Sequence, residues 1–385
     1  MKLFEKKLNE IRLALEKSTN PIIFFDVDTD GSLSYIQLKK EFPQLIGFPL
    51  DKDLKKQKKV IEKYLVFSDL ILIFDIPFLH EEFLDFFKDK QIIWVDHHPT
   101  NQKDLIERYN ILHFNPLNYN LNDNRPACYW AYLLSKNINN LPFAVVGSIS
   151  DFFLLNEISE LFLNYSDLVK LFFPIKGNKL KEILFFIKKY SFNDKRVRKQ
   201  REDLIRFLIY ETTVSVLKNF FDFICKFEDY GDSLKAFKRI EKLSLVEILN
   251  KIKENKKFPF VEYNNLMLEY NKRLNIAKQS KEYFFNFYSY VGEISFAKTL
   301  SEELMYYFNN TKIMVVCFKK PNKEWYSCSM RSRGLVINTI VSDILKDLNG
   351  RGGGHPFAVG CSVNLNDYDK FKKRIFDRFE KLISN

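Results

Sequence analysis

The tripeptide Asp96-His97-His98 has the side chains best suited to bind a metal ion. It follows the apolar residues 92–95 and precedes Pro99, so it stands at the end of a predicted buried strand. The chain has five histidines, and two adjacent ones directly after a carboxylate are difficult to explain by packing. Imidazole nitrogens together with carboxylate oxygens suit Mn²⁺ or a similar divalent ion. The tripeptide therefore predicts a metal site.

Other apolar runs in the first 155 residues also end in acidic residues, and each is predicted to be a strand end. The first run, 21–27, leads into three carboxylates on alternate residues, and Gly31 allows the backbone to turn before a helix begins at Ser32 or Ser34. The acidic residues are Asp26, Asp28 and Asp30 after the first run, Asp75 after the second, and Asp151 after the third.

A parallel sheet would bring these strand ends together. The carboxyl ends of the strands in such a sheet lie along one edge, where these folds bind ligands. Several shared carboxylates suit two metal ions, which lower the pKa of a bridging water towards about 7 and neutralise charge on a phosphoryl group. The alternative is that each Asp only caps a helix. That explanation suits any single Asp, but not four acidic sites with an adjacent pair of histidines.

The order of these residues resembles the DHH phosphoesterase superfamily. The chain contains D-x-D-G-x-x-S at 28–34, the isolated Asp75, D-H-H at 96–98 and G-x-x-x-D at 147–151. Near the C-terminus, residues 350–360 are similar to the G-G-G-H-x-x-A-x-G signature of the associated substrate-binding domain, DHHA1. The resemblance covers roughly the first 155 and the last 100 residues.

The resemblance implies roles for individual residues. Asp75 would bridge two divalent cations, for which Mn²⁺ is favoured and Mg²⁺ is the alternative. The first ion would be bound by Asp28 and Asp75, and the second by Asp30, Asp75, His97 and Asp151. His98 would face the scissile phosphate and Asp96 would orient the histidine pair, so His98, Asp96 and Asp30 form the predicted catalytic set. Many members have a histidine where this chain has Phe24, and Asp26, an acid that RecJ-type exonucleases also carry, is expected to replace it as a ligand.

A second group of candidates would bind a substrate phosphate. Three consecutive glycines expose backbone N–H groups in a loop that can hold a phosphate, and the following histidine adds a donor. A predicted strand ends in S-x-R-S, as in the family, where the arginine is the candidate for a bidentate contact. A surface arginine paired with an acid is the alternative. The candidates are Ser329, Arg331, Gly352, Gly353, Gly354 and His355.

The charge of the chain is unevenly distributed. Residues 1–155 contain 19 Lys and Arg against 21 Asp and Glu, whereas residues 156–385 contain 41 against 28. The basic part favours a polyanionic partner such as single-stranded DNA or RNA, although an AT-rich genome would also enrich Lys and Asn. The segment 195–201, with five basic residues in seven, is either a nucleic-acid contact or a solvated helix face.

The expected fold is α/β in three parts. Residues 1–155 are predicted to form a DHH domain with a mostly parallel sheet and helices on both faces. Residues 156–284 are predicted to be a helical connector, with an uninterrupted helix over 204–227. Residues 285–385 are predicted to form a smaller α/β DHHA1 domain.

The expected function is a RecJ-like exonuclease, similar to the short archaeal form, that hydrolyses single-stranded nucleic acid by two-metal activation of water. One alternative is a nanoRNase or 3′-phosphoadenosine-5′-phosphate phosphatase that acts on short substrates. Another is a replisome scaffold with weak or no nuclease activity, because eukaryotic relatives of RecJ are structural helicase subunits. An active nuclease is also compatible with docking on a replication complex through a GINS-like partner.

Two expectations rest on absent features. The sequence has no uninterrupted apolar run near 20 residues and no signal peptide, so no membrane association and a cytoplasmic location are expected. The five cysteines lack metal-binding spacing, and buried free thiols are expected rather than disulfides.

Overall fold

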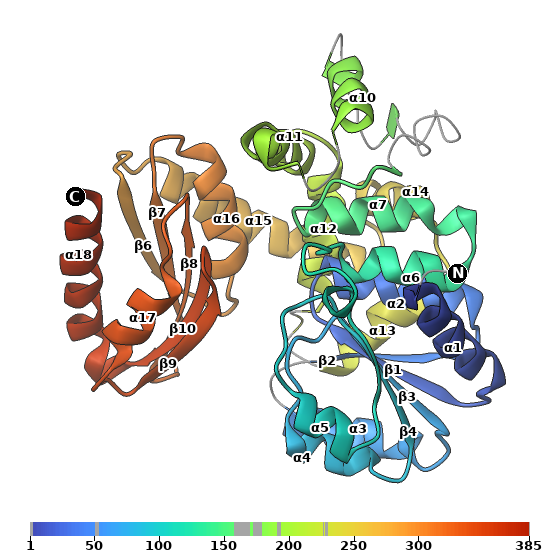
Figure 1. Cartoon of the computed structure of the whole chain (residues 1–385). Coiled ribbons are helices and arrows are strands. Elements are labelled where there is room, and N and C mark those ends of the chain that lie inside the picture. The colour runs from blue at the N-terminus through green and yellow to red at the C-terminus, as the bar shows by residue number, and fades with distance from the viewer. Residues whose placement is uncertain are drawn as a thin grey trace. The chain divides into compact units, whose positions relative to one another are not determined.

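The computed structural model describes residues 3–50, 54–157, 170–171, 179–190, 194–225, 227 and 230–384. The chain forms two compact units, residues 1–264 and 265–385 (Figure 1). The boundaries expected at residues 155 and 284 stay a prediction.

The N-terminal unit is built on a five-stranded parallel sheet with the order β2-β1-β3-β4-β5. The strands are β1 (Pro21–Asp26), β2 (Ile46–Leu50), β3 (Leu70–Phe74), β4 (Gln91–Val95) and β5 (Leu112–Phe114). Strand β3 is buried along its whole length, as expected for a central strand with helices on both faces. The expected parallel sheet is therefore confirmed.

Helices flank this sheet and continue beyond it. Before residue 151 they are α1 (Leu3–Lys17), α2 (Thr29–Glu41), α3 (Leu54–Leu65), α4 (Glu81–Leu84), α5 (Lys103–Arg108), α6 (Ala127–Ser135) and α7 (Leu141–Ser150). Later helices are α10 (Lys179–Lys189), α11 (Arg198–Tyr210), α12 (Val214–Ile224), α13 (Tyr230–Ile240), α14 (Leu245–Glu254) and α15 (Phe260–Lys278). Short 3₁₀ turns lie at η1 (Asp85–Phe87), η2 (Pro116–Asn118), η3 (Ile138–Asn140) and η4 (Lys195–Val197).

Successive side chains of β1 pack on opposite faces of the sheet. Phe24 packs against Phe83 and Phe87, which lie in α4 and η1, with ring centroids 5.2 and 5.4 Å away. Phe25 stacks on Tyr35 of α2 at 4.8 Å and meets Phe237 of α13 at 5.0 Å. Because successive side chains of a strand point to opposite faces, the apolar run binds helices on both sides of the sheet.

Two expectations about the acidic segments were wrong. Helix α2 begins at Thr29 rather than at Ser32 or Ser34, because the Asp28 carboxylate caps it by accepting a hydrogen bond from the Gly31 N–H. The apolar run before Asp151 is helix α7 rather than a strand. All ten residues of α7 are buried, and its only polar residues, Ser148 and Ser150, are not spaced like the exposed face of a helix, so the sequence shows no helical periodicity.

Most of the described residues of the connector are helical, as expected, but the predicted helix over 204–227 is interrupted between α11 and α12. The Thr212 hydroxyl accepts a hydrogen bond from the Val214 N–H at 3.2 Å and so competes with helical hydrogen bonding. In the basic segment 195–201, Arg196 pairs with Asp194 and Arg198 pairs with Glu202. These pairs are typical of a solvated surface.

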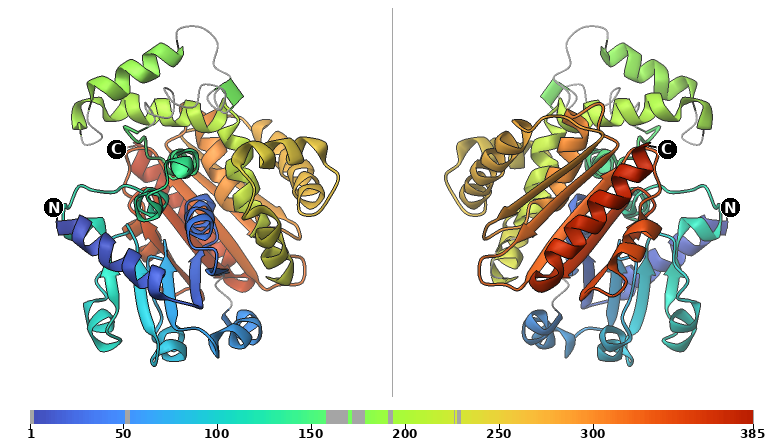
Figure 2. Two further views of the ribbon diagram at one scale, coloured as in Figure 1. Left: turned by 90° about the vertical axis from the view of Figure 1, so that its right-hand side faces the viewer. Right: turned by 90° about the vertical axis from the view of Figure 1, so that its left-hand side faces the viewer.

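The C-terminal unit contains a mixed sheet with the order β6-β7-β8-β10-β9, in which only β6 and β7 are parallel. Its core lies between the sheet and helices α17 and α18, and Figure 2 shows α18, in red, lying across this face. Helix α16 packs against β7 and β8. The elements are β6 (Phe285–Val291), α16 (Ala297–Tyr307), β7 (Ile313–Lys319), β8 (Trp325–Ser332), α17 (Asn338–Leu345), β9 (Gly350–His355), β10 (Ala358–Asn364), η5 (Leu365–Asp367) and α18 (Tyr368–Ser384).

Two expectations about this unit were also wrong. The glycine-rich segment is the edge strand β9 rather than a loop, and it pairs with β10 from Gly350 to His355. Cys317 and Cys328 lie opposite each other on β7 and β8 and form a disulfide, whereas Cys128, Cys225 and Cys361 are free. The cysteine spacing alone does not reveal that a hairpin brings two of them together.

Within the described part of the chain, no helix is long and apolar enough to cross a membrane.

Candidate metal centre

The acidic and histidine candidates of the N-terminal unit lie at the carboxyl edge of its sheet. Asp26 is the last residue of β1, Asp75 follows β3, and Asp96 follows β4. Three more come from the ends of helices. Asp28 and Asp30 lie at the N-terminus of α2, and Asp151 caps the C-terminus of α7.

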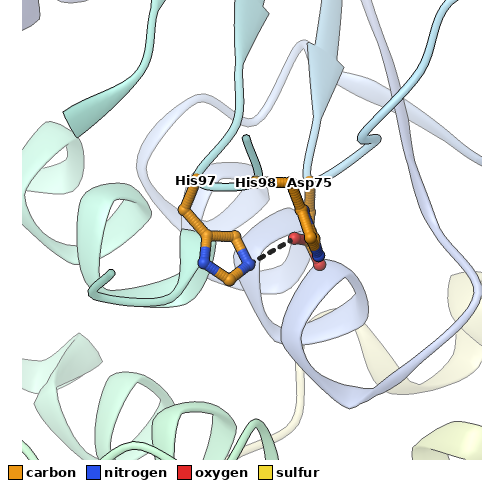
Figure 3. Close-up of side chains that lie close together, drawn as sticks. All are labelled: Asp75, His97 and His98. Atoms are coloured by element: carbon orange, nitrogen blue, oxygen red, sulfur yellow. Dashed lines mark ion pairs between the residues drawn. The ribbon is translucent and has the colours of Figure 1, made fainter. Parts of the chain in front are cut away.

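His97 lies among three carboxylates from three different elements. Its Nε2 atom is 3.4 Å from Asp75 Oδ1, 3.8 Å from Asp30 Oδ2 and 3.8 Å from Asp151 Oδ2. Figure 3 shows the His97 ring directed at the Asp75 carboxylate. Ligand atoms held at about 2.1 Å from one ion lie about 3–3.6 Å apart. The four groups are therefore spaced for a common divalent cation after a small adjustment.

A second group of possible ligands shares Asp75. Asp26, Asp28 and Asp75 each place a carboxylate oxygen within 4.8 Å of the others. Asp75 also belongs to a group with His97 and His98 at the same limit. Because Asp75 stands in both places, the arrangement suits two cations with one bridging carboxylate.

Asp75 is buried and has a left-handed backbone conformation. Its φ angle is 62°, in the left-handed region, and its N–H donates to Val95 O at 2.9 Å. Within the described residues, its buried Oδ1 accepts no hydrogen bond. Burial, together with the charges of the nearby carboxylates, raises the pKa of Asp75 well above its usual range. A cation would supply the missing charge and coordination, so the residues fit a metal.

Asp30 is oriented by the N-terminus of α6. Its two oxygens accept hydrogen bonds from Ala127 N and Cys128 N, both at 2.8 Å. Burial and the neighbouring Asp28 charge nevertheless raise the pKa of Asp30 to about 6. The backbone amides of α6 were not anticipated, because nothing in the sequence near residue 127 reveals a contact 97 residues away.

The partly buried His98 pairs with the buried Asp96 beside this cluster. His98 Nδ1 lies 2.9 Å from Asp96 Oδ1, and the His98 N–H donates to the other oxygen at 3.1 Å. Burial alone would lower the pKa of His98, but its hydrogen bond to Asp96 and the surrounding negative charges raise it to about 9. Asn115 donates to His98 O at 2.8 Å. Its place directly after β5 and before Pro116 was an available signal that the sequence prediction did not use.

Phe24, at the position where many members of the resembled superfamily have a histidine, lies in the hydrophobic core. Phe24 is fully buried among aromatic rings and is no ligand. Asp26, two residues later, is the acidic group that β1 contributes to the cluster.

The phosphate-binding candidates of the C-terminal unit occupy two strands, one of them at the edge of the sheet. Ser329 and Arg331 lie on β8, and β10 separates them from Gly353 and His355 on β9. The β10 residue Ala358 pairs with both Arg331 and His355. Since opposite residues in antiparallel strands share a face, these four positions lie on one side of the sheet.

Arg331 is paired with an acid in this structure. Its guanidinium donates to Glu302 Oε1 at 2.7 Å and to the Ser329 hydroxyl at 3.1 Å. The arginine is thus paired with an acid, as the alternative to phosphate binding proposed. A phosphate would have to compete with Glu302 for the guanidinium.

Comparison with known proteins agrees with this architecture. Residues 288–381 match the family model of the DHHA1 domain. The same fold, over nearly the whole chain, occurs in RecJ from Thermus thermophilus in complex with Mn²⁺. That likeness has a TM-score of 0.56 and 14% identity, and it covers 98% of this chain and 55% of the Thermus chain. Residues 288–381 therefore form a DHHA1 domain, and the likeness to RecJ over the whole chain is one of fold.

Two other solved structures are similar over nearly their full length. An exonuclease RecJ bound to manganese is 14% identical with a TM-score of 0.58, covering 97% of this chain and 94% of that chain. CDC45 from Entamoeba histolytica is 11% identical with a TM-score of 0.53, covering 98% of each chain. Identities this low show a shared fold. No curated protein matches the sequence.

Proposed function

We propose that this DHH/DHHA1 chain is a metal-dependent phosphodiesterase that hydrolyses single-stranded nucleic acid as a RecJ-like exonuclease. The observation that carries the proposal is the placement of His97 Nε2 within 3.4–3.8 Å of carboxylates from Asp30, Asp75 and Asp151. Three elements far apart in sequence supply these groups, and the buried cluster has a large negative charge that a pair of cations would neutralise.

In this proposal, Asp26, Asp28 and Asp75 hold one cation, and Asp30, Asp75, His97 and Asp151 hold the other. Mn²⁺ suits the mixed nitrogen and oxygen ligands, and Mg²⁺ is the alternative. When bound by these residues, two cations would supply activation of a water molecule and stabilisation of negative charge on the phosphoryl group. Hydrogen bonds from two backbone amides of α6 fix the orientation of the Asp30 carboxylate, which would reduce the cost of binding the cation.

His98 has a separate role. In the metal-free protein its hydrogen bond to Asp96 and the nearby carboxylates raise its pKa to about 9, and the Asp96 contact occupies Nδ1. Nε2 then donates a hydrogen bond to a phosphate oxygen. Asp96 acts through His98 as a positioning residue, because it is fully buried and fixes the orientation of the ring.

The C-terminal unit would bind a neighbouring phosphate of the strand. Arg331 exchanges its Glu302 partner for a phosphate, and the Ser329 hydroxyl, the backbone of Gly352, Gly353 and Gly354, and His355 complete the contact. The net charge of +11, concentrated after residue 155, supports a polyanionic substrate. A GINS-like replication partner remains part of the proposal, supported by the likeness in fold to CDC45 over nearly the whole chain.

The experiment is a cleavage assay with Mn²⁺ and end-labelled single strands of DNA and RNA, dinucleotides and 3′-phosphoadenosine-5′-phosphate. Degradation of the long strands is expected. His97→Ala should abolish it, whereas His80→Ala, which alters an exposed histidine outside the cluster, should not.

Each other outcome contradicts a different part of the proposal. Cleavage confined to dinucleotides or the bisphosphate would identify a nanoRNase or phosphatase. Full activity in His97→Ala would refute the metal assignment. A protein that binds Mn²⁺ but cleaves none of the substrates would favour the scaffold.

A further inference from the structure

Helix α12 contains a buried ion pair. Lys218 Nζ lies 2.8 Å from Asp222 Oδ2, and the two side chains are 7% and 6% exposed. The rest of this helix is strongly apolar, with Leu217, Phe220 and Phe221 fully buried around the pair. Burying two charges costs desolvation energy that their attraction often fails to recover, so a pair of this kind contributes little net stability. Its position in the fold therefore calls for another explanation.

The pair contacts the residue between two metal-ligand candidates. Thr29 Oγ1 lies 2.8 Å from Asp222 Oδ1 and 3.0 Å from Lys218 O, and all three residues are buried. Thr29 is flanked by Asp28 and Asp30. Lys218 and Thr29 thus occupy the two oxygens of the Asp222 carboxylate, which fixes its orientation.

Helix α12 also packs against both helices that carry acidic groups of the cluster. It contacts α2, whose first turn contains Asp30, and α7, whose C-terminus is capped by Asp151. At the end of α12, Cys225 Sγ lies 3.8 Å from Ser32 Oγ of α2. The hydrogen bonds of Thr29 are therefore part of a larger packing contact between helix α12 and the start of α2, where Asp28 and Asp30 lie.

We propose that Lys218 and Asp222 are positioning residues that set the geometry of the Asp28–Asp30 segment through the Thr29 hydroxyl, and thereby its affinity for divalent cations. The inference rests on the proposed metal centre. A merely structural pair would hold α12 in place without affecting the metal. A positioning pair would alter metal affinity when only the hydroxyl link is removed.

The test is Thr29→Val, which keeps the shape of the side chain and removes the hydroxyl, measured beside Thr29→Ser, which keeps it. Mn²⁺ affinity is measured on the full-length, metal-free protein by isothermal titration calorimetry, with free Mn²⁺ followed by its paramagnetic resonance signal. Removal of partners that orient metal ligands lowers affinity about 10- to 100-fold. We expect that loss in Thr29→Val and near-normal affinity in Thr29→Ser.

Thr212→Val is the matched control. Thr212 is a buried threonine of the same unit whose hydroxyl bonds only to backbone groups of its own turn among the contacts described, Leu208 O and Val214 N. This variant should lose stability without losing Mn²⁺ affinity. If Thr29→Val fails to fold, Lys218→Met with Asp222→Asn, which removes both charges together, is expected to lower Mn²⁺ affinity.

Normal Mn²⁺ affinity in a folded Thr29→Val protein, or equal losses in Thr29→Val and Thr29→Ser, would overturn the inference. If Thr29→Val does not fold, normal affinity in the double variant would overturn it. Failure of the proposed metal centre is distinguishable, because the unaltered protein would then bind no Mn²⁺.

Discussion

At the scale of single residues, Asp75 shows how a binding site conflicts with stability. Its side chain is buried beside other carboxylates, its φ angle is 62°, and within the described residues its Oδ1 accepts no hydrogen bond. A carboxyl group whose pKa is raised in the folded protein binds protons more tightly there than in the unfolded chain. In acid the Asp75 carboxyl group is protonated in both states and does not destabilise the fold. The free energy of unfolding falls as the pH rises above the ordinary pKa of an aspartate, about 3.9, because the unfolded chain then releases this proton more readily than the folded protein.

Asp75→Asn should therefore stabilise the metal-free protein at pH 7 by about 1–2 kcal/mol, the size typical of relieving an unfavourable site. Asparagine tolerates the left-handed conformation and has no charge to repel its neighbours. The same change should abolish stabilisation by Mn²⁺, since the bridging ligand is weakened. Thermal unfolding at pH 7 and pH 4.5, with Mn²⁺ or with a chelator, measures both effects. The gain should shrink at pH 4.5, and an Asp75→Asn protein less stable than the original without metal would contradict this account.

At the scale of elements, β9 requires glycine for two different reasons. A Cβ atom on Gly352 would lie 2.5 Å from Cys361 Cβ, so the neighbouring strand leaves no room for a side chain. A Cβ atom on Gly353 would meet nothing within 4 Å. Gly353 instead shares a row with Gly360 and Ser329 on the face that contains Arg331. The open strip there lets a ligand approach the backbone.

Gly352→Ala and Gly353→Ala should therefore differ. Gly352→Ala should destabilise the protein by about 1–3 kcal/mol, the usual cost of overpacking. Gly353→Ala should leave the unfolding temperature unchanged or slightly higher, but its methyl group should raise KM for single strands on the order of tenfold, which is about 1.4 kcal/mol. Thermal unfolding and steady-state kinetics separate the two effects. Unchanged KM in Gly353→Ala would remove this strip from the binding site.

At the scale of the whole molecule, charge is divided between the part that contains the candidate metal centre and a basic remainder. The first 155 residues contain 21 acidic against 19 basic residues, and the remaining residues contain 41 basic against 28 acidic ones. The acidic groups near His97 would repel a nucleic acid without cations. The basic part would attract its phosphates over several nucleotides.

Binding of a long single strand should consequently weaken with salt. Contacts to about four phosphates predict a loss of roughly 50-fold between 50 and 200 mM salt, because each contact releases counterions. A dinucleotide should show a much smaller dependence. Fluorescence anisotropy with the His97→Ala protein measures binding without cleavage. Equal salt dependence for the two ligands would indicate that the substrate is short.

The sequence by itself determined three strands of the N-terminal sheet and the acids that follow them, whereas β2 and β5 were not predicted. Buried strands are local apolar runs, and the runs ending near Asp26, Asp75 and Asp96 match β1, β3 and β4. The helical connector and the C-terminal α/β unit were also predictable, because periodicity and a glycine-rich signature are short-range features. Local patterns failed where a run was buried on all sides, as in α7, or where side-chain capping ended a helix, as at Thr212.

Only the tertiary structure decided which groups meet around the acids. Thr29 reaches Asp222 across 193 positions, and Asp30 accepts from amides nearly 100 residues away. The tertiary structure also pairs Arg331 with Glu302 and brings Cys317 and Cys328 together in a disulfide. Hydrogen bonds, ion pairs and disulfides depend on distance in space and leave no periodic trace in the chain. The ligand types were therefore visible in the sequence, whereas their orientation depended on the packing of helices α2, α6, α7 and α12.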